Sequence, residues 1–154
     1  MYVKSLIVQN NHYIDMLKGI KRQYDLCNIR KYMQLYSLSI INCSNIDDDL
    51  ILQINIDPNY TLFNDIVLIN CDLITDSIFT HLQNADMNFI ELNNCNQITT
   101  NGFRYIANYK NLKMLKIEEC SNIIDSDLRF LSNLENIEEL RLGCSHQNIS
   151  KNNL

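Results

Sequence analysis

The chain has 154 residues, of which 46% are hydrophobic and 20% are charged, so we expect one domain with a modest core. Its formal net charge of −5 disfavours a nucleic-acid-binding domain that depends on phosphate contacts. Three glycines and one proline are too few for a sandwich or barrel with many tight hairpins, or for a phosphate-cradling loop. The 22 isoleucines and 23 asparagines indicate codon bias, which we discount before interpreting hydrophobicity.

The leader, residues 1–34, carries six Lys or Arg and two Asp, whereas residues 35–154 carry seven Lys or Arg and sixteen Asp or Glu. A basic leader therefore precedes an acidic body. Apolar residues at helical spacing within 13–34 predict one or two amphipathic helices. We interpret this segment as an N-terminal helical cap on the domain that follows; a basic helix that binds a membrane or a partner is the alternative.

The chain has no apolar run near the roughly 20 residues of a membrane-spanning helix, and its start lacks the apolar segment and cleavage site of a secretory signal. We therefore expect a soluble protein, with peripheral membrane association only through partners. Reduced thiols are then the default for the six cysteines, which contain no C-x-x-C pair, so zinc clusters and thioredoxin-type redox sites are not expected.

Four cysteines mark a repeat with spacings of 28, 24 and 25 residues. Each follows a short alternating segment, has an Ile three residues later, and has apolar residues eight and eleven residues later. Alternation followed by i, i+3 spacing predicts a strand and then a helix. The cysteines are Cys43, Cys71, Cys95 and Cys120; the isoleucines are Ile46, Ile74, Ile98 and Ile123; the apolar pairs are Ile51/Ile54, Phe79/Leu82, Phe103/Ile106 and Leu128/Leu131.

Such units stack into an α/β fold with parallel strands on one face and helices on the other. Four units and a partial fifth, Leu140-Arg141-Leu142, give about 4.5 repeats over residues 35–154. No unit buries its apolar face alone, and about three are needed for stability. The sequence therefore predicts a short solenoid over 35–154, preceded by the helical cap over 1–34.

The motif Cys71-Asp-Leu-Ile74-Thr75-Asp76-Ser-Ile78 and its partial copies resemble the cysteine-containing leucine-rich repeats over about residues 35–145. Three branches of that superfamily compete. They are the F-box substrate receptors of ubiquitin ligases, small relatives of a mitotic-exit antagonist, and the group of mitochondrial ATP synthase coupling factor B and the distal membrane arm assembly factor of complex I. The last is most similar in size and order, which implies a non-enzymatic accessory subunit at the mitochondrial inner membrane.

Two repeated columns have structural interpretations. The position five residues after each cysteine is occupied by Asp48, Asp76, Thr100 and Asp125. We expect these side chains to cap the helices that follow them, rather than to form a carboxylate active site. The four repeat cysteines should form a buried ladder, because neighbouring strands lie about 4.8 Å apart and a disulfide needs Cβ atoms about 3.8 Å apart.

Strand residues between the inward positions should face the concave surface, which repeat proteins commonly use to bind partners. Ile41, Val67 and Ile69 predict an apolar patch at one end, covered either by this chain or by a partner. The other end is charged. A column of residues at the turn after each strand should form a hydrogen-bonding stack. The remaining candidate partner-binding residues on the concave face are Glu91, Lys116, Glu118 and Arg141; the turn residues are Asn42, Asn70, Asn94 and Glu119.

The C-terminal end is predicted to be open. Leu140 and Leu142 would lie in an edge strand, and the tail after Ile149 is too short to supply a helix over them. An uncovered edge invites pairing or docking. We therefore expect another chain to bury this end.

No catalytic constellation is evident: His12, His81 and His146 are scattered, and Cys144 with His146 is the only close Cys/His pair. We predict a non-catalytic scaffold without cofactor, metal or small-molecule substrate, whose partners are other protein subunits rather than specifically read nucleic acid. The leading hypothesis is an accessory or assembly subunit of a mitochondrial ATP synthase or respiratory complex. The alternative is a cytoplasmic adaptor or substrate-recognition module of an F-box-type ubiquitin ligase system.

Overall fold

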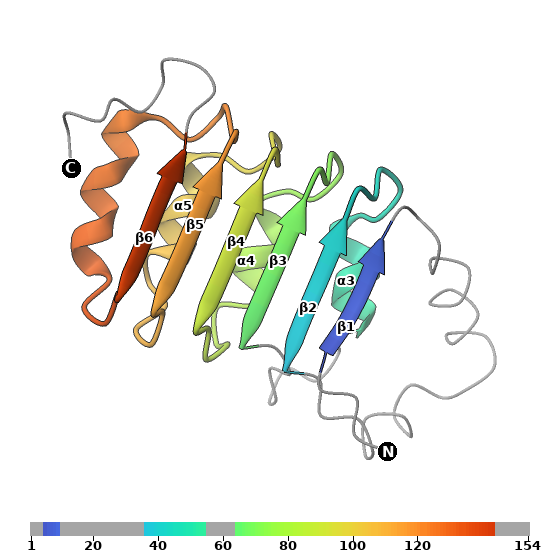
Figure 1. The fold of residues 1–154 in the computed structure, drawn as a ribbon, viewed down its shortest axis with the longest axis horizontal. Coiled ribbons are helices and arrows are strands. Elements are labelled where there is room, and N and C mark those ends of the chain that lie inside the picture. The colour runs from blue at the N-terminus through green and yellow to red at the C-terminus, as the bar shows by residue number, and fades with distance from the viewer. Residues whose placement is uncertain (1–4, 10–35, 55–63, 144–154) are drawn as a thin grey trace.

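The computed structural model describes residues 5–9, 36–54 and 64–143 of the chain (Figure 1). Within them the fold is α/β, with six parallel strands whose order in the sheet is their order in the sequence. The strands are β1 (Ser5–Gln9), β2 (Ser37–Ile41), β3 (Asp65–Ile69), β4 (Phe89–Asn93), β5 (Met114–Glu118) and β6 (Glu139–Gly143). The helices are α3 (Asp48–Ile54), α4 (Ser77–His81), α5 (Thr100–Ile106) and the 3-10 helix η1 (Asp125–Asn133).

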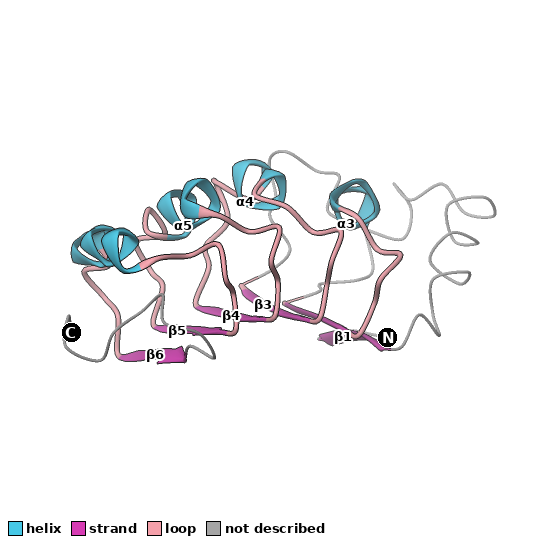
Figure 2. Cartoon of the chain, turned by 90° about the horizontal axis from the view of Figure 1, so that it is seen from above, coloured by secondary structure: helices cyan, strands magenta, loops and turns pink. Residues whose placement is uncertain are grey.

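The helices all lie on one side of the sheet. The row of strands is bent into an arc, and the helices lie on its outer side (Figure 2). Neighbouring helices contact one another in chain order: α3 packs beside α4, α4 beside α5, and α5 beside η1. No helix of the described residues covers the opposite side of the sheet, which we call the open face. Among the described residues, one whole side of the sheet is therefore uncovered.

The strand register confirms the alignment that the cysteines predict. Leu38 pairs with Ile66, Ile66 with Ile90, Ile90 with Leu115, and Leu115 with Leu140. Successive units therefore meet at equivalent positions, including the partial fifth unit. Because residues alternate between the two faces of a strand, this register places every inward apolar residue in the layer between the sheet and the helices.

The core occupies that layer, and the predicted inward positions are buried. Burial alternates in β2 to β5, with the second and fourth residue of each strand buried. The four isoleucines at three residues after cysteine are at most 1% exposed. Most of the apolar residues predicted at eight and eleven residues after cysteine are also buried, whereas Leu131 is only partly buried. The buried ones include Ile51, Phe79, Leu82, Phe103 and Ile106.

Strand β1 is not anticipated by the sequence reading, which assigned residues 1–34 to a helical leader. It pairs with β2 in the same register, Leu6 opposite Leu38 and Val8 opposite Ile40. The segment Leu6-x-Val8-x-Asn10 follows the strand pattern of the later units, with Asn11 where their cysteine stands, so aligning without the cysteine would have found it. The helices expected within 13–34 lie outside the described residues.

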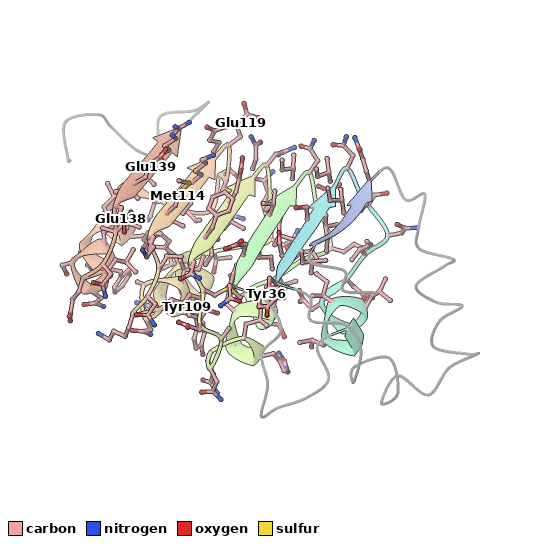
Figure 3. The ribbon with its side chains drawn as sticks, turned by 60° about the horizontal axis from the view of Figure 1, so that its bottom comes forward. Tyr36, Tyr109, Met114, Glu119, Glu138 and Glu139 are labelled. Atoms are coloured by element: carbon pink, nitrogen blue, oxygen red, sulfur yellow. The ribbon has the colours of Figure 1, made fainter. Side chains whose placement is uncertain are left out.

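The turn after each of β2 to β5 contains one residue in a left-handed conformation: Asn42, Asn70, Asn94 and Glu119 have φ between 50° and 54°. Asparagine tolerates this region better than most residues. The Asn70 amide donates to Asn42 Oδ1 at 2.5 Å, and the Asn94 amide donates to Asn70 Oδ1 at 2.8 Å. The predicted stack is thus confirmed for the asparagines, and Glu119 lies past the end of β5 (Figure 3).

The expectation that Asp48 and Asp76 cap their own helices is wrong. The Asp48 carboxylate accepts hydrogen bonds from the Thr75 backbone N–H (3.0 Å) and hydroxyl (2.5 Å) of the next unit. The Asp76 carboxylate accepts the equivalent pair from Thr99, at 2.7 and 2.6 Å, and makes no side-chain bond to α4. The helix-start donors are instead satisfied by other side chains. At α3 the Asp47 carboxylate accepts from Leu50 N–H, and at α4 and α5 the hydroxyls of Thr75 and Thr99 accept from Ser77 N–H and Asn101 N–H.

Each aspartate therefore holds the capping threonine of the following unit, and we call this arrangement the Asp–Thr clamp. The third junction reverses it: the Thr100 hydroxyl donates to Asp127, which is 1% exposed and also accepts from the Ile124 N–H. Thr100 is thus not a cap either, since Thr99 precedes it at the N-cap of α5. Asp48, Asp76 and Thr100 thus join successive units to one another, which local sequence rules for single helices do not predict.

Candidate interaction surface

The open face carries three columns of outward side chains, one residue from each of β2 to β6 in every column. All but Arg141 are half-buried, because neighbouring strands pack them side by side. The first column was not predicted as a binding surface. It consists of Ser37, Asp65, Phe89, Met114 and Glu139; the central column is Ser39, Val67, Glu91, Lys116 and Arg141; the third is Ile41, Ile69, Asn93, Glu118 and Gly143.

The predicted apolar patch lies at the β2–β3 end of the open face. Ile41 is paired with Ile69 across the two strands, and Val67 lies one outward position before Ile69. The three side chains are half-buried rather than fully exposed, since they pack against one another. Strand β1 extends the patch with Ile7, which pairs with Ser39 and is 56% exposed. We call Ile7, Ile41, Val67 and Ile69 the apolar patch.

The β4–β6 end of the open face is charged, and its charges compensate one another. Lys116 Nζ lies 3.7 Å from Glu91 Oε2 and 5.3 Å from the centre of the Phe89 ring. The Asn93 amide donates to Glu118 Oε2 at 3.0 Å. Arg141 pairs with Glu139 within β6. These contacts hold the polar side chains at this end of the open face in a defined arrangement.

Asp65 lies in the first column at the start of β3. Partial burial raises the pKa of its carboxyl above the ordinary value, because desolvation disfavours the charged form. Its strand neighbours in that column are Ser37 and Phe89. Binding of a partner over this position would remove more water and raise this pKa further.

Strand β6 forms one edge of the sheet within the described residues, as predicted. It pairs with β5 alone, and its inward residues Leu140 and Leu142 are half-buried, whereas the equivalent residues of the earlier strands are fully buried. Among the described residues, two apolar side chains and one strand edge therefore lack the cover that each earlier unit receives from the next.

The four repeat cysteines are buried and free, as the ladder predicts. Cys71 and Cys95 approach backbone carbonyls of the preceding strand, with Sγ at 3.4 Å from Ile40 O and 3.3 Å from Leu68 O. Burial raises the pKa of Cys120 to about 12, and the hydrogen bond with Cys95, followed by burial, raises the pKa of Cys71. A thiol with a raised pKa is a poor nucleophile. The same hydrogen bond lowers the pKa of Cys95, but Cys95 is fully buried, so we interpret the ladder as packing.

The other chemistry-bearing residues are not brought together. His81 ends α4, where its Nδ1 lies 2.8 Å from Ser77 O, and His12, Cys144 and His146 fall outside the described ranges. No group of three His, Cys, Asp or Glu side chains in residues 5–9, 36–54 and 64–143 is arranged to hold a metal ion. None of the helices in these ranges is long and apolar enough to cross a bilayer. In comparisons with known proteins, no family model and no curated sequence matches the chain.

Proposed function

We propose that the chain is a cysteine-containing leucine-rich repeat solenoid that acts as a non-catalytic scaffold for other proteins. The observation that carries the proposal is the open face, a side of the sheet that no described element covers, with an apolar patch at one end and paired charges at the other. The repeating strand, turn and helix units and their common register support the assignment to this repeat class.

The composition of the open face suits a protein partner. An exposed Ile7 beside half-buried aliphatic residues supplies apolar area that gains free energy when it is covered. The paired polar side chains of β4 to β6 supply a rim that is able to fix orientation. The half-buried Leu140 and Leu142 of β6 offer a second contact, at the end of the sheet.

For the partner assembly, we propose a mitochondrial membrane complex, with the chain as an accessory or assembly subunit of the ATP synthase or a respiratory complex. The support is the similarity of the sequence layout to the coupling factor B group. The second candidate is an adaptor of an F-box-type ubiquitin ligase system, supported by the repeat motif around Cys71, Thr75 and Asp76.

Organelle fractionation followed by native gel electrophoresis tests this choice. Co-migration of the full-length chain with a respiratory complex or the ATP synthase in the mitochondrial fraction is the expected result. Co-isolation with a cullin and its adaptor from the cytosolic fraction would replace the first candidate with the second. Migration as a free monomer in every fraction would contradict the scaffold role itself.

A further inference from the structure

The helix side of the molecule carries a second surface, formed by the cations of α5 and η1. The described ranges contain six Lys and Arg side chains. Four of them pair with glutamates: Lys110 with Glu135, Lys113 with Glu138, Lys116 with Glu91, and Arg141 with Glu139. Arg104 and Arg129 have no carboxylate partner among the described residues, and both are exposed.

These two arginines share one aromatic ring. Arg104 Cζ lies 5.1 Å and Arg129 Cζ lies 4.8 Å from the centre of Phe130. Both distances are within the roughly 6 Å at which a guanidinium is attracted to a ring face. The two like charges thus lie within about 10 Å of each other, close to the Debye length of about 8 Å at physiological ionic strength, so their fields reinforce one another.

The ring also limits the motion of the two side chains. Phe130 is half-buried and packs against the core from η1, so it offers a fixed support to Arg104 from α5 and to Arg129 from its own helix. A guanidinium stacked in this way keeps its N–H groups free to bind a carboxylate with two parallel hydrogen bonds. Arginine and aromatic residues are also enriched among the residues that dominate binding energy at interfaces.

We propose that Arg104, Arg129 and Phe130 form a docking site for a short acidic segment of a partner protein. Two carboxylates two residues apart on an extended segment lie about 7 Å apart, which fits a pair of guanidinium groups within about 10 Å of each other. The net charge of −5 repels a long polyanion such as a nucleic acid, whereas a short segment meets mainly the local field of the arginines. This site is separate from the open face and does not depend on the role assigned there.

The test is a titration of the full-length protein with a hexaglutamate peptide, followed by the NMR signals of the arginine side-chain Nε–H groups. We expect saturable shifts at Arg104 and Arg129, and a loss of affinity of about fivefold for each of Arg104→Gln and Arg129→Gln, as exposed charge contacts are worth up to about 1 kcal/mol. Lys110→Gln is the matched control, since that cation is exposed and paired with Glu135, and it should change affinity less than twofold. Far-UV circular dichroism verifies that each variant is folded.

Three outcomes would overturn the proposal. An equal loss with Lys110→Gln would mean that only overall charge matters, and absent or unsaturated shifts at the two arginines would mean that there is no site. Tighter binding of a single-stranded oligonucleotide than of hexaglutamate in the same buffer would assign the surface to nucleic acid instead. Phe130→Leu supplies a further measurement: it keeps both charges and the apolar contact, so unchanged hexaglutamate affinity would contradict the role of the ring.

Discussion

At the residue scale, the four turns after β2 to β5 have the same backbone conformation at one position, but the residue type at that position differs. Three use asparagine, whereas Glu119 adopts φ of 54°. The left-handed conformation raises the free energy of most residues by about 1–2 kcal/mol, and this penalty is smaller for asparagine. The asparagine excess of the composition therefore has a partial physical explanation, which also indicates where the stack can be improved.

We predict that Glu119→Asn raises the free energy of unfolding by about 0.5–1 kcal/mol, because asparagine is better suited to the positive φ at this turn. Urea denaturation followed by circular dichroism measures the change. Glu119→Gln is the matched control, since it removes the charge but keeps the size and the backbone preference. Equal stabilisation by both variants would assign the effect to charge and contradict the conformational argument.

The cysteine ladder gives a second prediction. Burial raises the pKa of Cys120 to about 12, well above the ordinary thiol value, so little thiolate is present at neutral pH. The hydrogen bond with Cys71 lowers the pKa of Cys95, so protection there must come from burial; all four side chains are at most 7% exposed. We therefore expect Cys43, Cys71, Cys95 and Cys120 to resist iodoacetamide in the native protein at pH 7.5 and to react fully in denaturant. Peptide mapping by mass spectrometry reads each site, and rapid alkylation of Cys71 or Cys95 under native conditions would contradict this account.

The titration of Asp65 gives the pH-dependent prediction at this scale. Its pKa is raised by partial burial, so the folded state binds this proton more tightly than the unfolded state, and stability from this group is lost as pH rises through its unfolded and folded pKa values. Asp65→Asn should therefore raise the melting temperature at pH 7. The difference should shrink as pH falls below the pKa of the unfolded carboxyl, about 3.9; a difference independent of pH would contradict the desolvation argument.

At the element scale, the Asp–Thr clamp explains how consecutive units are joined at their helix starts. It also explains Gly102, because a Cβ at this position would lie 2.4 Å from Asp76 Oδ1. Without a side chain at residue 102, the carboxylate is able to reach both donors of Thr99. The glycine of α5 is thus required by the neighbouring unit rather than by its own helix.

We predict that Gly102→Ala lowers the free energy of unfolding by about 1–3 kcal/mol, the cost of displacing the half-buried Asp76 carboxylate from its donors. In an Asp76→Ala background the same change should cost much less, or stabilise by up to about 1 kcal/mol through helix propensity. Chemical denaturation of the four proteins gives this coupling energy. Equal effects of Gly102→Ala in both backgrounds would show that the clamp is not what the glycine serves.

The sequence predicts the strands and helices of those units in which a cysteine marks the repeat. Cysteine spacing and apolar alternation locate β2 to β5, their inward residues and the register, since a parallel register transmits one unit's pattern to the next. The same reading missed β1, whose unit has Asn11 in place of cysteine. It also misassigned Asp48 and Asp76, because a capping rule considers only neighbouring residues. Their hydrogen-bond partners, Thr75 and Thr99, are 27 and 23 residues away in the sequence. For the open face it located Ile41, Val67 and Ile69 but not Ile7 or Phe89.

At the scale of the whole molecule, the account depends on which surfaces are left uncovered. The helices cover one face of the sheet, and no described element covers the other (Figure 2). The two candidate contacts, the open face and the arginine pair on Phe130, lie on different sides of the layer. A scaffold that joins two partners needs two such separate surfaces, and multivalent binding would strengthen each contact through the other.

The most direct test of the scaffold claim is quantitative affinity isolation of tagged full-length protein from its own cells, comparing wild type with Ile41→Lys/Ile69→Lys. The control is Asn108→Lys/Asn133→Lys, which adds the same charge at exposed positions on the helix side, with folding of both variants verified by circular dichroism. The account predicts that the partners recovered with wild type are retained by the control and reduced at least tenfold by the open-face variant, as lysine ammonium groups would be buried without a counter-charge. Equal recovery by all three proteins would contradict the assignment of the open face as the partner-binding surface.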